Sequence, residues 1–288
     1  MAVVDGNALA KEIRARVLQE VSSITQAGGK ISFAAVIVGN DPSSLLYIDK
    51  KSKACREVGI EMTVHKLGER DRVTQIDLNN LLKNLSADNK VHGILLQLPL
   101  PHGLDANEAV SHISPCKDVD GLTAENFGRL ACGKPGLVPC TALGILHILK
   151  SCGVPLAGKK VTVVGRSNIV GKPTAFLLMN SDATVTVAHS KTKDLIKHTI
   201  DADIIVVAAG SPGLLKGDMV KDGVIIIDVG INRKDGHVVG DVDFEDCQKK
   251  ASIITPVPGG VGPLTIAFLL SNIIQAYNFQ IGGGKVNV

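Results

Sequence analysis

Four polar side chains in the first hundred residues could support proton transfer. Ser44, Tyr47 and Lys51 follow one another at intervals of three and four residues, which places them on one face of a helix. Gln97 stands alone in the apolar segment GILLQLPL, and a buried amide needs hydrogen-bonding partners. A lysine at the open end of an α/β unit can relay protons at neutral pH. A solvated helix lysine and a glutamine bonded to backbone groups are the simpler alternatives.

A second polar feature is the segment CKDVDG. It places two carboxylates, Asp118 and Asp120, in a loop directly before a glycine. Such a loop can present a carboxylate to a ligand, and an ordinary turn is the alternative.

The segment VTVVGRSNIVGKP, from Val161 to Pro173, could bind a nucleotide. Gly165 is predicted to end a strand and Gly171 to begin a helix, so backbone N–H groups would form an anion site suited to a pyrophosphate. The segment departs from G-x-G-x-x-G, because Ser167 replaces the second glycine and the last glycine comes one residue late. A plain strand–helix turn therefore stays open.

The end of the next predicted strand distinguishes between cofactors. A site for NAD would carry an acidic residue there, about 20 residues past the glycines, to bind the ribose 2′-hydroxyl. The strand instead ends in Ala188-His189-Ser190-Lys191, and Arg166 stands beside the glycine turn. These residues favour a 2′-phosphate, and so NADP over NAD.

Two alternating series of helices and strands must position these residues. In the first, hydrophobic periodicity predicts helices over 9–24, 44–58 and 74–85 and strands over 33–38, 60–66 and 91–98. A loop-rich stretch, 99–139, follows. The second series has helices over 141–151, 172–179 and 191–200, strands over 161–164, 184–188, 204–208 and 224–228, and a final helix over 261–277. This alternation predicts two α/β domains, the second a Rossmann-like doubly wound parallel sheet, with a cleft between them.

The composition narrows the class of function. The chain has 288 residues, enough for about two domains, and a formal net charge of +3 without a basic block. Aromatic residues make up only 3% of it, which disfavours a binder of single-stranded nucleic acid and suits an aliphatic parallel-sheet core. Small-molecule chemistry is the resulting hypothesis.

The cysteines, the N-terminal residues and one uncharged segment bear on where in the cell the protein is expected. Six cysteines without Cys-x-x-Cys spacing predict free, mostly buried thiols in a reducing cytosol and no metal site. The N-terminal residues do not resemble a signal peptide. The uncharged segment 251–284 has its most apolar part at 264–274, too short to cross a bilayer, so it is interpreted as a buried helix.

Eight segments together resemble the bifunctional methylenetetrahydrofolate dehydrogenase/cyclohydrolase family. In chain order they are YIDKK, GILLQLPLP, KDVDG, PCT, GRSNIVGKP, DVGIN, GDVDF and TPVPGGVGP. The resemblance covers about 33–277 and implies a cytosolic homodimer that uses NADP to oxidise methylenetetrahydrofolate to the methenyl form and then hydrates it to 10-formyltetrahydrofolate. It also implies a folate-binding catalytic domain over 1–142 plus 264–288 and an NADP-binding domain over 143–263.

The resemblance also implies roles for particular residues. Lys51 would assist proton movement in the cyclohydrolase step, with Gln97 bonded to it. Tyr47 would pack on the folate and orient Lys51, and Asp120 would bind the pterin. The remaining implied ligands are Ser44, Gly259, Gly260 and Pro263 for folate, and Gly165, Arg166, Ser167, Asn168, Ser190 and Ile231 for NADP.

Several positions depart from the family's commonest form, and two other functions stay open. Ala142 follows Cys140-Thr141 where proline is frequent, GLTAEN replaces GFHPEN, and Ala188 stands where cysteine is common. Tyr-x-x-x-Lys also occurs in short-chain NADP oxidoreductases, but there the pair follows the nucleotide turn. A non-enzymatic NADP-sensing module is the other alternative. Sequence also leaves open how strictly NADP is preferred over NAD.

Overall fold

The computed structural model describes residues 1–68 and 73–281 and divides them into two compact units. Unit 1 comprises residues 1–11, 130–133 and 139–268. Unit 2 comprises residues 12–129, 134–138 and the chain from Leu269 onward. The expected folate-binding domain and NADP-binding domain stay a prediction, because the division into two units does not show which ligand each unit binds.

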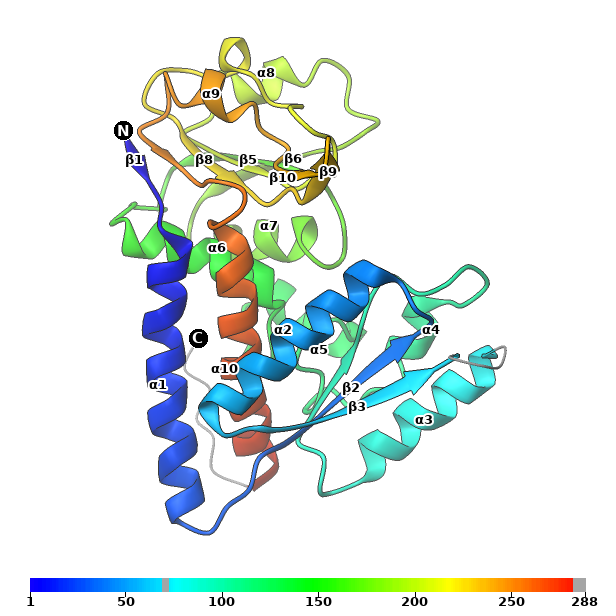
Figure 1. The fold of residues 1–288 in the computed structure, drawn as a ribbon. Coiled ribbons are helices and arrows are strands. Elements are labelled where there is room, and N and C mark those ends of the chain that lie inside the picture. Colours follow the sequence, from blue (N-terminus) through cyan, green and yellow to red (C-terminus); the bar gives the residue numbers. More distant parts are fainter. Residues whose placement is uncertain (69–72, 282–288) are drawn as a thin grey trace. The chain divides into compact units, whose positions relative to one another are not determined.

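Unit 2 contains a three-stranded parallel sheet in the order β3 (Glu61–Leu67), β2 (Ser32–Val38), β4 (Gly93–Leu96) (Figure 1). All but the first residue of β2 are buried, as expected for a strand with both faces covered. On one face Val36 packs with Leu78 and Leu82 of helix α3 (Gln75–Ala87) and with Val110 of helix α4 (Ala106–Val110).

Helix α2 (Pro42–Val58) connects β2 to β3, and its two ends are set by local chemistry. The Asp41 carboxylate accepts a hydrogen bond from the backbone N–H of Ser44 at 2.7 Å, and Pro42 occupies the first helical position. Gly59 ends the helix in the left-handed region with φ 82°. This fixed start decides which face of α2 carries each of its side chains.

Unit 1 contains a six-stranded sheet in which every described pairing is parallel. The order is β1 (Ala2–Val3), β11 (Ile253–Ile254), β8 (Ile225–Asp228), β7 (Ile204–Val207), β5 (Lys160–Val164), β6 (Thr184–Ala188). The chain passes from β5 to β6 on one side and then to β7 on the other side of β5. Ligands of such sheets bind beyond the carboxyl ends of the strands where the order reverses, here between β5 and β7.

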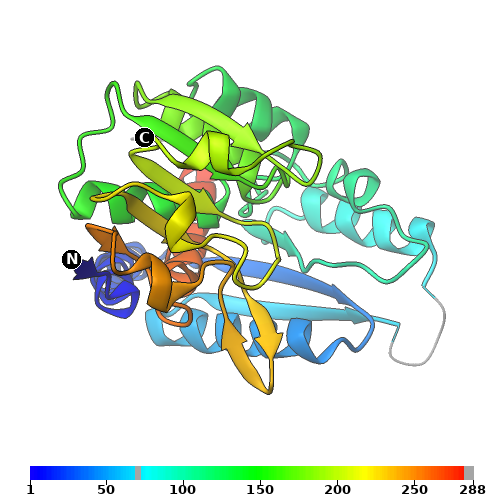
Figure 2. The same ribbon diagram turned by 90° about the horizontal axis from the view of Figure 1, so that it is seen from above.

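Helices α6 (Cys140–Ser151) and α7 (Gly171–Met179) lie along one face of this sheet, and the other face packs against α9 (Phe244–Cys247) and the segments around it (Figure 1). A short 3₁₀ helix, η1 (Gly217–Met219), belongs to these segments. The β9 (Asn232–Lys234) and β10 (His237–Val239) strands form an antiparallel hairpin that projects from the sheet of unit 1 (Figure 2). Its turn is Asp235-Gly236, both with positive φ, a combination typical of tight hairpins.

The structure corrects several predicted elements. The helix expected over 191–200 is reduced to α8 (Ile196–Thr199), because a turn in which Thr192 Oγ1 accepts from the N–H of His189 occupies its start and Asp194 adopts a left-handed φ of 55°. The strand expected over 91–98 is shorter, and α4 and α5 (Ala124–Ala131) lie in the stretch expected to be loop-rich.

Two long helices, α1 (Gly6–Gln26) and α10 (Val261–Ile281), contribute residues to both units. Among the described residues, α10 alone is long and apolar enough to cross a membrane by length and composition, and it is longer than the predicted 261–277. More than half of its most apolar window is buried inside the protein, as in the core helix of a soluble protein. It also carries the buried Asn272, which donates to the carbonyls of Val119 and Val138.

Candidate active site

The α2 helix directs Ser44 and Lys51 toward the same side as its buried residues. Ser44, Ile48 and Cys55 are buried, and Lys51 lies three residues after Ile48 and four before Cys55, on the same stripe. Lys51 itself is half-buried. The helix therefore turns this lysine toward the sheet of unit 2, as the spacing predicts.

Lys51 and Gln97 are brought together. Lys51 Nζ donates to Gln97 Oε1 at 2.9 Å. The Gln97 amide is held on both sides, because its Nε2 donates to the carbonyl of Leu98 at 2.7 Å and its backbone N–H donates to Val36 at 2.8 Å, just beyond the end of β4. Since lysine has only donors, this network leaves Oε1 as the acceptor that faces the ammonium.

Tyr47 lies one turn before Lys51 on α2 and is half-buried, and burial raises the pKa of its phenol. The cation near its ring is Lys50, whose Nζ lies 5.9 Å from the ring centroid. The sequence singled out Lys51 as the partner of Tyr47 and did not identify Lys50. A ring with one cation beside it remains a suitable stacking surface.

The two carboxylates of the KDVDG segment differ in their surroundings. Asp118 is buried and accepts from the backbone N–H of Thr123 at 2.7 Å and from Asn126 Nδ2 at 3.0 Å. Asp120, two residues later, is half-buried. Asp118 therefore holds the loop, and Asp120 is the more exposed of the two carboxylates.

Two further residues anchor this loop, and sequence reasoning did not identify them. Lys117 is buried and donates from Nζ to the carbonyl of Asp88 at 2.8 Å, just after α3, while desolvation lowers its pKa. Asn272 of α10 donates to the carbonyl of Val119 at 2.8 Å. The lone buried asparagine in an apolar helix was the available signal.

The loop from Gly165 to Gly171 has the tight geometry that a pyrophosphate site needs. A Cβ on Gly165, whose φ is 127°, would overlap the carbonyl of Ala208 after β7. A Cβ on Gly171 would overlap the carbonyl of Gly165. Both glycines are therefore required by close backbone approach at the carboxyl ends of β5 and β7.

The exposed side chains of this loop are Arg166, Ser167, Asn168 and Ile169. Ser167 Oγ accepts from the N–H groups of Val170 at 3.2 Å and Gly171 at 3.4 Å, at the start of α7. Asn168 Oδ1 accepts from Lys172 Nζ at 2.7 Å, which adds a cation that the sequence did not point to. The loop thus brings two positive side chains to the positive N-terminal end of α7, whose first N–H groups bond to Ser167, and this surrounding favours an anion such as phosphate.

The other predicted ligands lie on unit 1 loops and at the start of α10. Ser190 is exposed in the turn that follows β6, and Ile231 is 55% exposed between β8 and the hairpin. Gly259 and Gly260 precede α10, and Pro263 lies in its first turn. Gly6 holds their loop closely, because its N–H donates to Gly259 at 3.0 Å and a Cβ on Gly6 would overlap Gly260. Cys140 and Thr141 form the first turn of α6, where Thr141 Oγ1 is 3.2 Å from Thr265 Oγ1.

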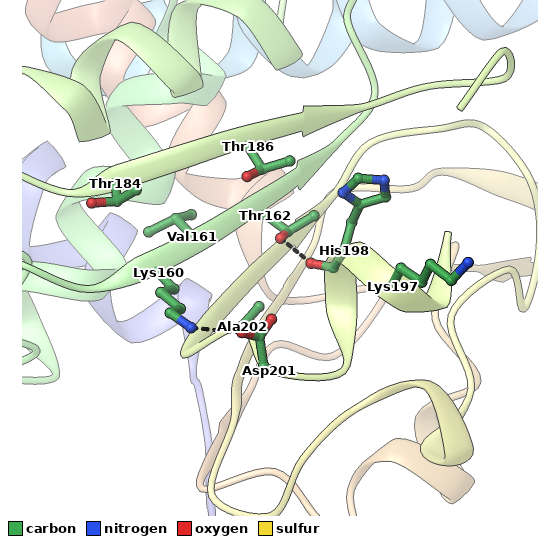
Figure 3. Close-up of a pocket in the computed structure, with 9 residues that line it drawn as sticks. All are labelled: Lys160, Val161, Thr162, Thr184, Thr186, Lys197, His198, Asp201 and Ala202. Atoms are coloured by element: carbon green, nitrogen blue, oxygen red, sulfur yellow. Dashed lines mark hydrogen bonds and ion pairs between the residues drawn. The ribbon is translucent and has the colours of Figure 1, made fainter. Parts of the chain in front are cut away.

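A pocket of about 250 Å³ lies elsewhere on unit 1, among β5, β6 and α8 (Figure 3). Its lysines are already paired, Lys160 with Asp201 at 2.6 Å and Lys197 with Asp194 at 3.0 Å. Lys160 and Thr184 stand at the amino ends of their strands, whereas ligands of parallel sheets bind at the carboxyl ends. The pocket is therefore not the cofactor site.

The six cysteines differ in exposure. Cys55, Cys140 and Cys247 are buried, Cys116 is half-buried, and Cys132 and Cys152 are exposed, so the expectation of mostly buried thiols holds for only half of them. Within residues 1–68 and 73–281 no group of three or more His, Cys, Asp or Glu side chains could hold a metal ion.

Comparison with known proteins identifies the family of the chain. Residues 4–120 match the family model of the tetrahydrofolate dehydrogenase/cyclohydrolase catalytic domain, and residues 139–281 match that of its NAD(P)-binding domain. The bifunctional protein FolD of Campylobacter concisus is 50% identical over 282 residues, which cover 98% of this chain and 99% of that protein.

Solved structures give the same result. The bifunctional FolD of Campylobacter jejuni has a TM-score of 0.94 at 47% identity, covering 97% of this chain and 99% of that one. The Trypanosoma brucei enzyme, solved with NADP cofactor and an inhibitor, has a TM-score of 0.92 at 38% identity, covering 98% and 99%. The chain belongs to the tetrahydrofolate dehydrogenase/cyclohydrolase family.

Proposed function

We propose that Lys51 and Gln97 carry the hydrolytic half, and the Gly165–Gly171 loop the cofactor half, of a bifunctional folate enzyme. The chain is an NADP-dependent methylenetetrahydrofolate dehydrogenase and methenyltetrahydrofolate cyclohydrolase of one-carbon metabolism. The observation that carries the proposal for the hydrolytic site is the 2.9 Å hydrogen bond from Lys51 to Gln97. The family assignment favours this enzyme over a short-chain oxidoreductase or an NADP sensor.

The residues around the Gly165–Gly171 loop fit NADP. Backbone N–H groups at the start of α7 suit the pyrophosphate, and Arg166 and Ser190 are exposed near the ends of β5 and β6, where a 2′-phosphate would be bound. No acidic residue occupies positions 188–191 to repel that phosphate. When bound, NADP supplies the hydride acceptor, and the role of Gly165, Arg166, Ser167, Asn168, Ser190 and Ile231 is to bind and orient it.

The cyclohydrolase step needs proton transfer, because water adds to the methenyl cation and loses a proton as the ring opens. Lys51 as the amine takes the proton from the added water, and as the ammonium it gives a proton to the ring nitrogen whose bond to the former methenyl carbon breaks. The remaining hydroxyl proton is released to solvent as the formyl group forms, and Gln97 keeps Lys51 Nζ at one position. The Gln97 amide can do so because its own Nε2 and backbone N–H are fixed by Leu98 and Val36. The chemistry thus depends on one lysine and one immobilised acceptor.

Folate binding is assigned to Tyr47, Asp120, Ser44 and the Gly259–Pro263 segment. The half-buried Tyr47 ring offers a stacking surface, and Asp120 offers a carboxylate on a loop fixed by Asp118 and Lys117. With this assignment, residues 1–142 and 264–288 form the folate-binding catalytic domain, and residues 143–263 form the NADP-binding domain.

A two-stage absorbance assay tests the proposed function. Purified protein is mixed with methylenetetrahydrofolate and NADP, and NADPH formation is recorded; methenyltetrahydrofolate is then supplied alone and its decay is recorded. We expect both signals to exceed the reactions without enzyme. Absence of NADPH formation would refute the dehydrogenase, and unaccelerated methenyl decay would refute the cyclohydrolase.

Assembly and location are also proposed. The chain is a cytosolic homodimer that binds neither nucleic acid nor membrane. Two features support dimerisation, because both could pair with a second copy of the chain. Strand β6 is at the edge of its sheet, and the apolar side chains exposed on or near it are Val187, Ile196 and Ile200. Light scattering should give a mass of about twice 30.2 kDa, and Val187→Lys should lower it. A monomeric wild type would contradict the proposal.

A further inference from the structure

Two buried carboxylates stand at the carboxyl edge of the unit 1 sheet and have no role in the function described above. Asp228 is the last residue of β8, and its oxygens accept from the backbone N–H groups of Gly230 at 2.9 Å, Asp241 at 3.0 Å and Val242 at 3.0 Å. Asp228 therefore ties the start of the β8–β9 connection to the segment that follows β10.

Asp241 continues the network to a neighbouring loop. It is fully buried, and its Oδ2 accepts from Ala209 at 2.7 Å and Gly210 at 2.9 Å. Its Oδ1 accepts from the N–H of Ser211 at 2.8 Å and from Asn232 Nδ2 at 2.8 Å. One carboxylate thus holds three successive N–H groups after β7 and a side chain at the start of the hairpin.

The glycines of the DVGIN and GDVDF segments make room for this arrangement. A Cβ on Gly230 would overlap the Asp241 carboxyl group, and a Cβ on Gly240 would overlap that of Asp228. Asp241 is therefore packed against Gly230, which follows Asp228 closely in the chain, and Asp228 is packed against Gly240, which directly precedes Asp241. We call Asp228 and Asp241 the carboxylate pair.

The segments that the carboxylate pair holds border the cofactor loop. Ala208, directly before the three N–H groups bound to Asp241, is the residue whose carbonyl leaves no room for a Cβ on Gly165. Ile231, proposed above as an NADP ligand, lies between Gly230, whose backbone N–H is bound by Asp228, and Asn232, whose side chain is bound by Asp241. The two segments follow the carboxyl ends of β7 and β8, and β7 is one of the two strands between which the order of the sheet reverses.

We propose that Asp241, supported by Asp228, is a positioning residue for the cofactor: it sets the 209–211 loop and Ile231 as two walls of the NADP site. This inference rests on the proposed cofactor site. A ligand site needs its contacting groups to be held by a supporting layer of hydrogen bonds, and small displacements of that layer weaken binding. A carboxylate suits this task because it only accepts, and all four groups that it faces are N–H donors.

Asp241→Asn tests the inference with little change in size. One oxygen becomes an NH₂ group that faces N–H donors, so two of the four hydrogen bonds are lost. We expect the KM for NADP to rise roughly tenfold or more, while the cyclohydrolase rate with methenyltetrahydrofolate stays within about twofold of wild type, because Lys51 and Gln97 belong to unit 2.

Asp203→Asn is the matched control. Asp203 also accepts a backbone N–H, that of Lys160 at 2.9 Å, and a side-chain donor, Lys221 Nζ at 2.6 Å, but it precedes β7 at the opposite edge of the same sheet. We expect this variant to lower the Tm and leave the KM for NADP unchanged. A folded Asp241→Asn protein with the wild-type KM for NADP, or one that loses both activities equally, would overturn the inference.

Asn232→Ala decides the question if Asp241→Asn does not fold. It removes a single hydrogen bond from a half-buried side chain, and we expect the KM for NADP to rise roughly threefold with the cyclohydrolase rate unchanged. An unchanged KM would overturn the inference. Failure of the proposed function is distinguishable, because the wild-type enzyme itself would then form no NADPH.

Discussion

Lys51 of helix α2 donates a 2.9 Å hydrogen bond to Gln97, which lies just beyond the end of β4. The two residues are 46 positions apart in the chain, and each is fixed by its own element. Their hydrogen bond gives a reason for the single amide in the apolar segment GILLQLPL. The pair also provides the most direct test of the proposed hydrolytic chemistry.

Lys51→Met should remove the proton-transferring group while keeping much of the apolar side chain. We expect the cyclohydrolase kcat to fall by roughly a hundredfold or more, the range typical of a lost general acid–base group. Lys53→Met, which alters an exposed lysine of the same helix, is the control and should leave the rate unchanged. A normal methenyl decay rate in Lys51→Met would refute the assignment.

Tyr47 should contribute to folate affinity through its ring. We expect Tyr47→Ala to raise the Kd for a tetrahydrofolate derivative roughly tenfold, since a lost aromatic stacking contact costs about 1 kcal/mol beyond buried area. Tyr47→Phe keeps the ring and should bind nearly as tightly. Equal affinity of all three proteins in a calorimetric titration would show that the ring does not contact folate.

Arg166 should contribute to the preference for NADP over NAD. We expect Arg166→Ala to raise the KM for NADP roughly tenfold or more and to change the KM for NAD little, because only NADP has a 2′-phosphate to pair with the guanidinium. Arg16→Ala, at an exposed position of α1, is the control. Steady-state rates with both cofactors measure the effect; an equal rise in both KM values would exclude a 2′-phosphate contact.

Asp228 should make stability depend on pH. Burial raises the pKa of its carboxyl to about 6 from an ordinary 3.8, against the opposing effect of its backbone hydrogen bonds. The folded state then holds the proton more tightly than the unfolded state. This contribution to the free energy of unfolding, at most about 3 kcal/mol, is full below about pH 4 and is lost as pH rises through 6.

Urea denaturation of wild type and Asp228→Asn between pH 4 and pH 7.5 measures this contribution. The asparagine variant cannot titrate, so the stability of wild type relative to the variant should decrease as pH rises. Parallel stability curves would indicate that the Asp228 pKa is the same in the folded and unfolded states.

The thiols should differ in reactivity toward iodoacetamide at pH 8. Cys132 and Cys152 are exposed and should be alkylated first. Burial raises the pKa of Cys55 and of Cys247 to about 12, so both keep their protons and react slowly. Time-resolved peptide mass spectrometry checks the order, and rapid labelling of Cys55 in the folded protein would contradict it.

Local patterns predicted those parts of the molecule that local chemistry determines. The parallel strands, the α2 face and the Gly165–Gly171 loop all follow from hydrophobic periodicity and glycine placement. The Asp235-Gly236 turn was also recognisable, although the hairpin was not predicted. The start of α8 was placed too early because Asp194 adopts a left-handed conformation, which aspartate does only in particular surroundings.

Other features depend on residues distant in the chain. The distinction between Asp118 and Asp120 depends on Asn126, Lys117 and Asn272, and no spacing rule connects these residues. The carboxylate pair likewise requires β7, β8 and the hairpin to be assembled. Sequence patterns therefore identified candidate groups, and the three-dimensional arrangement showed which of them are held rigidly.

The pairing of β1 with β11 constrains when unit 1 can form during synthesis. Ala2 lies in register with Ile253, and Val3 with Ile254, so the edge of the sheet joins two segments that are far apart in the chain. A ribosome-bound chain must keep Ala2 and Val3 available until Ile254 has left the exit tunnel. Contacts between residues so far apart in the chain slow folding. The last step in assembling this sheet therefore awaits translation of β11, which lies between β1 and β8.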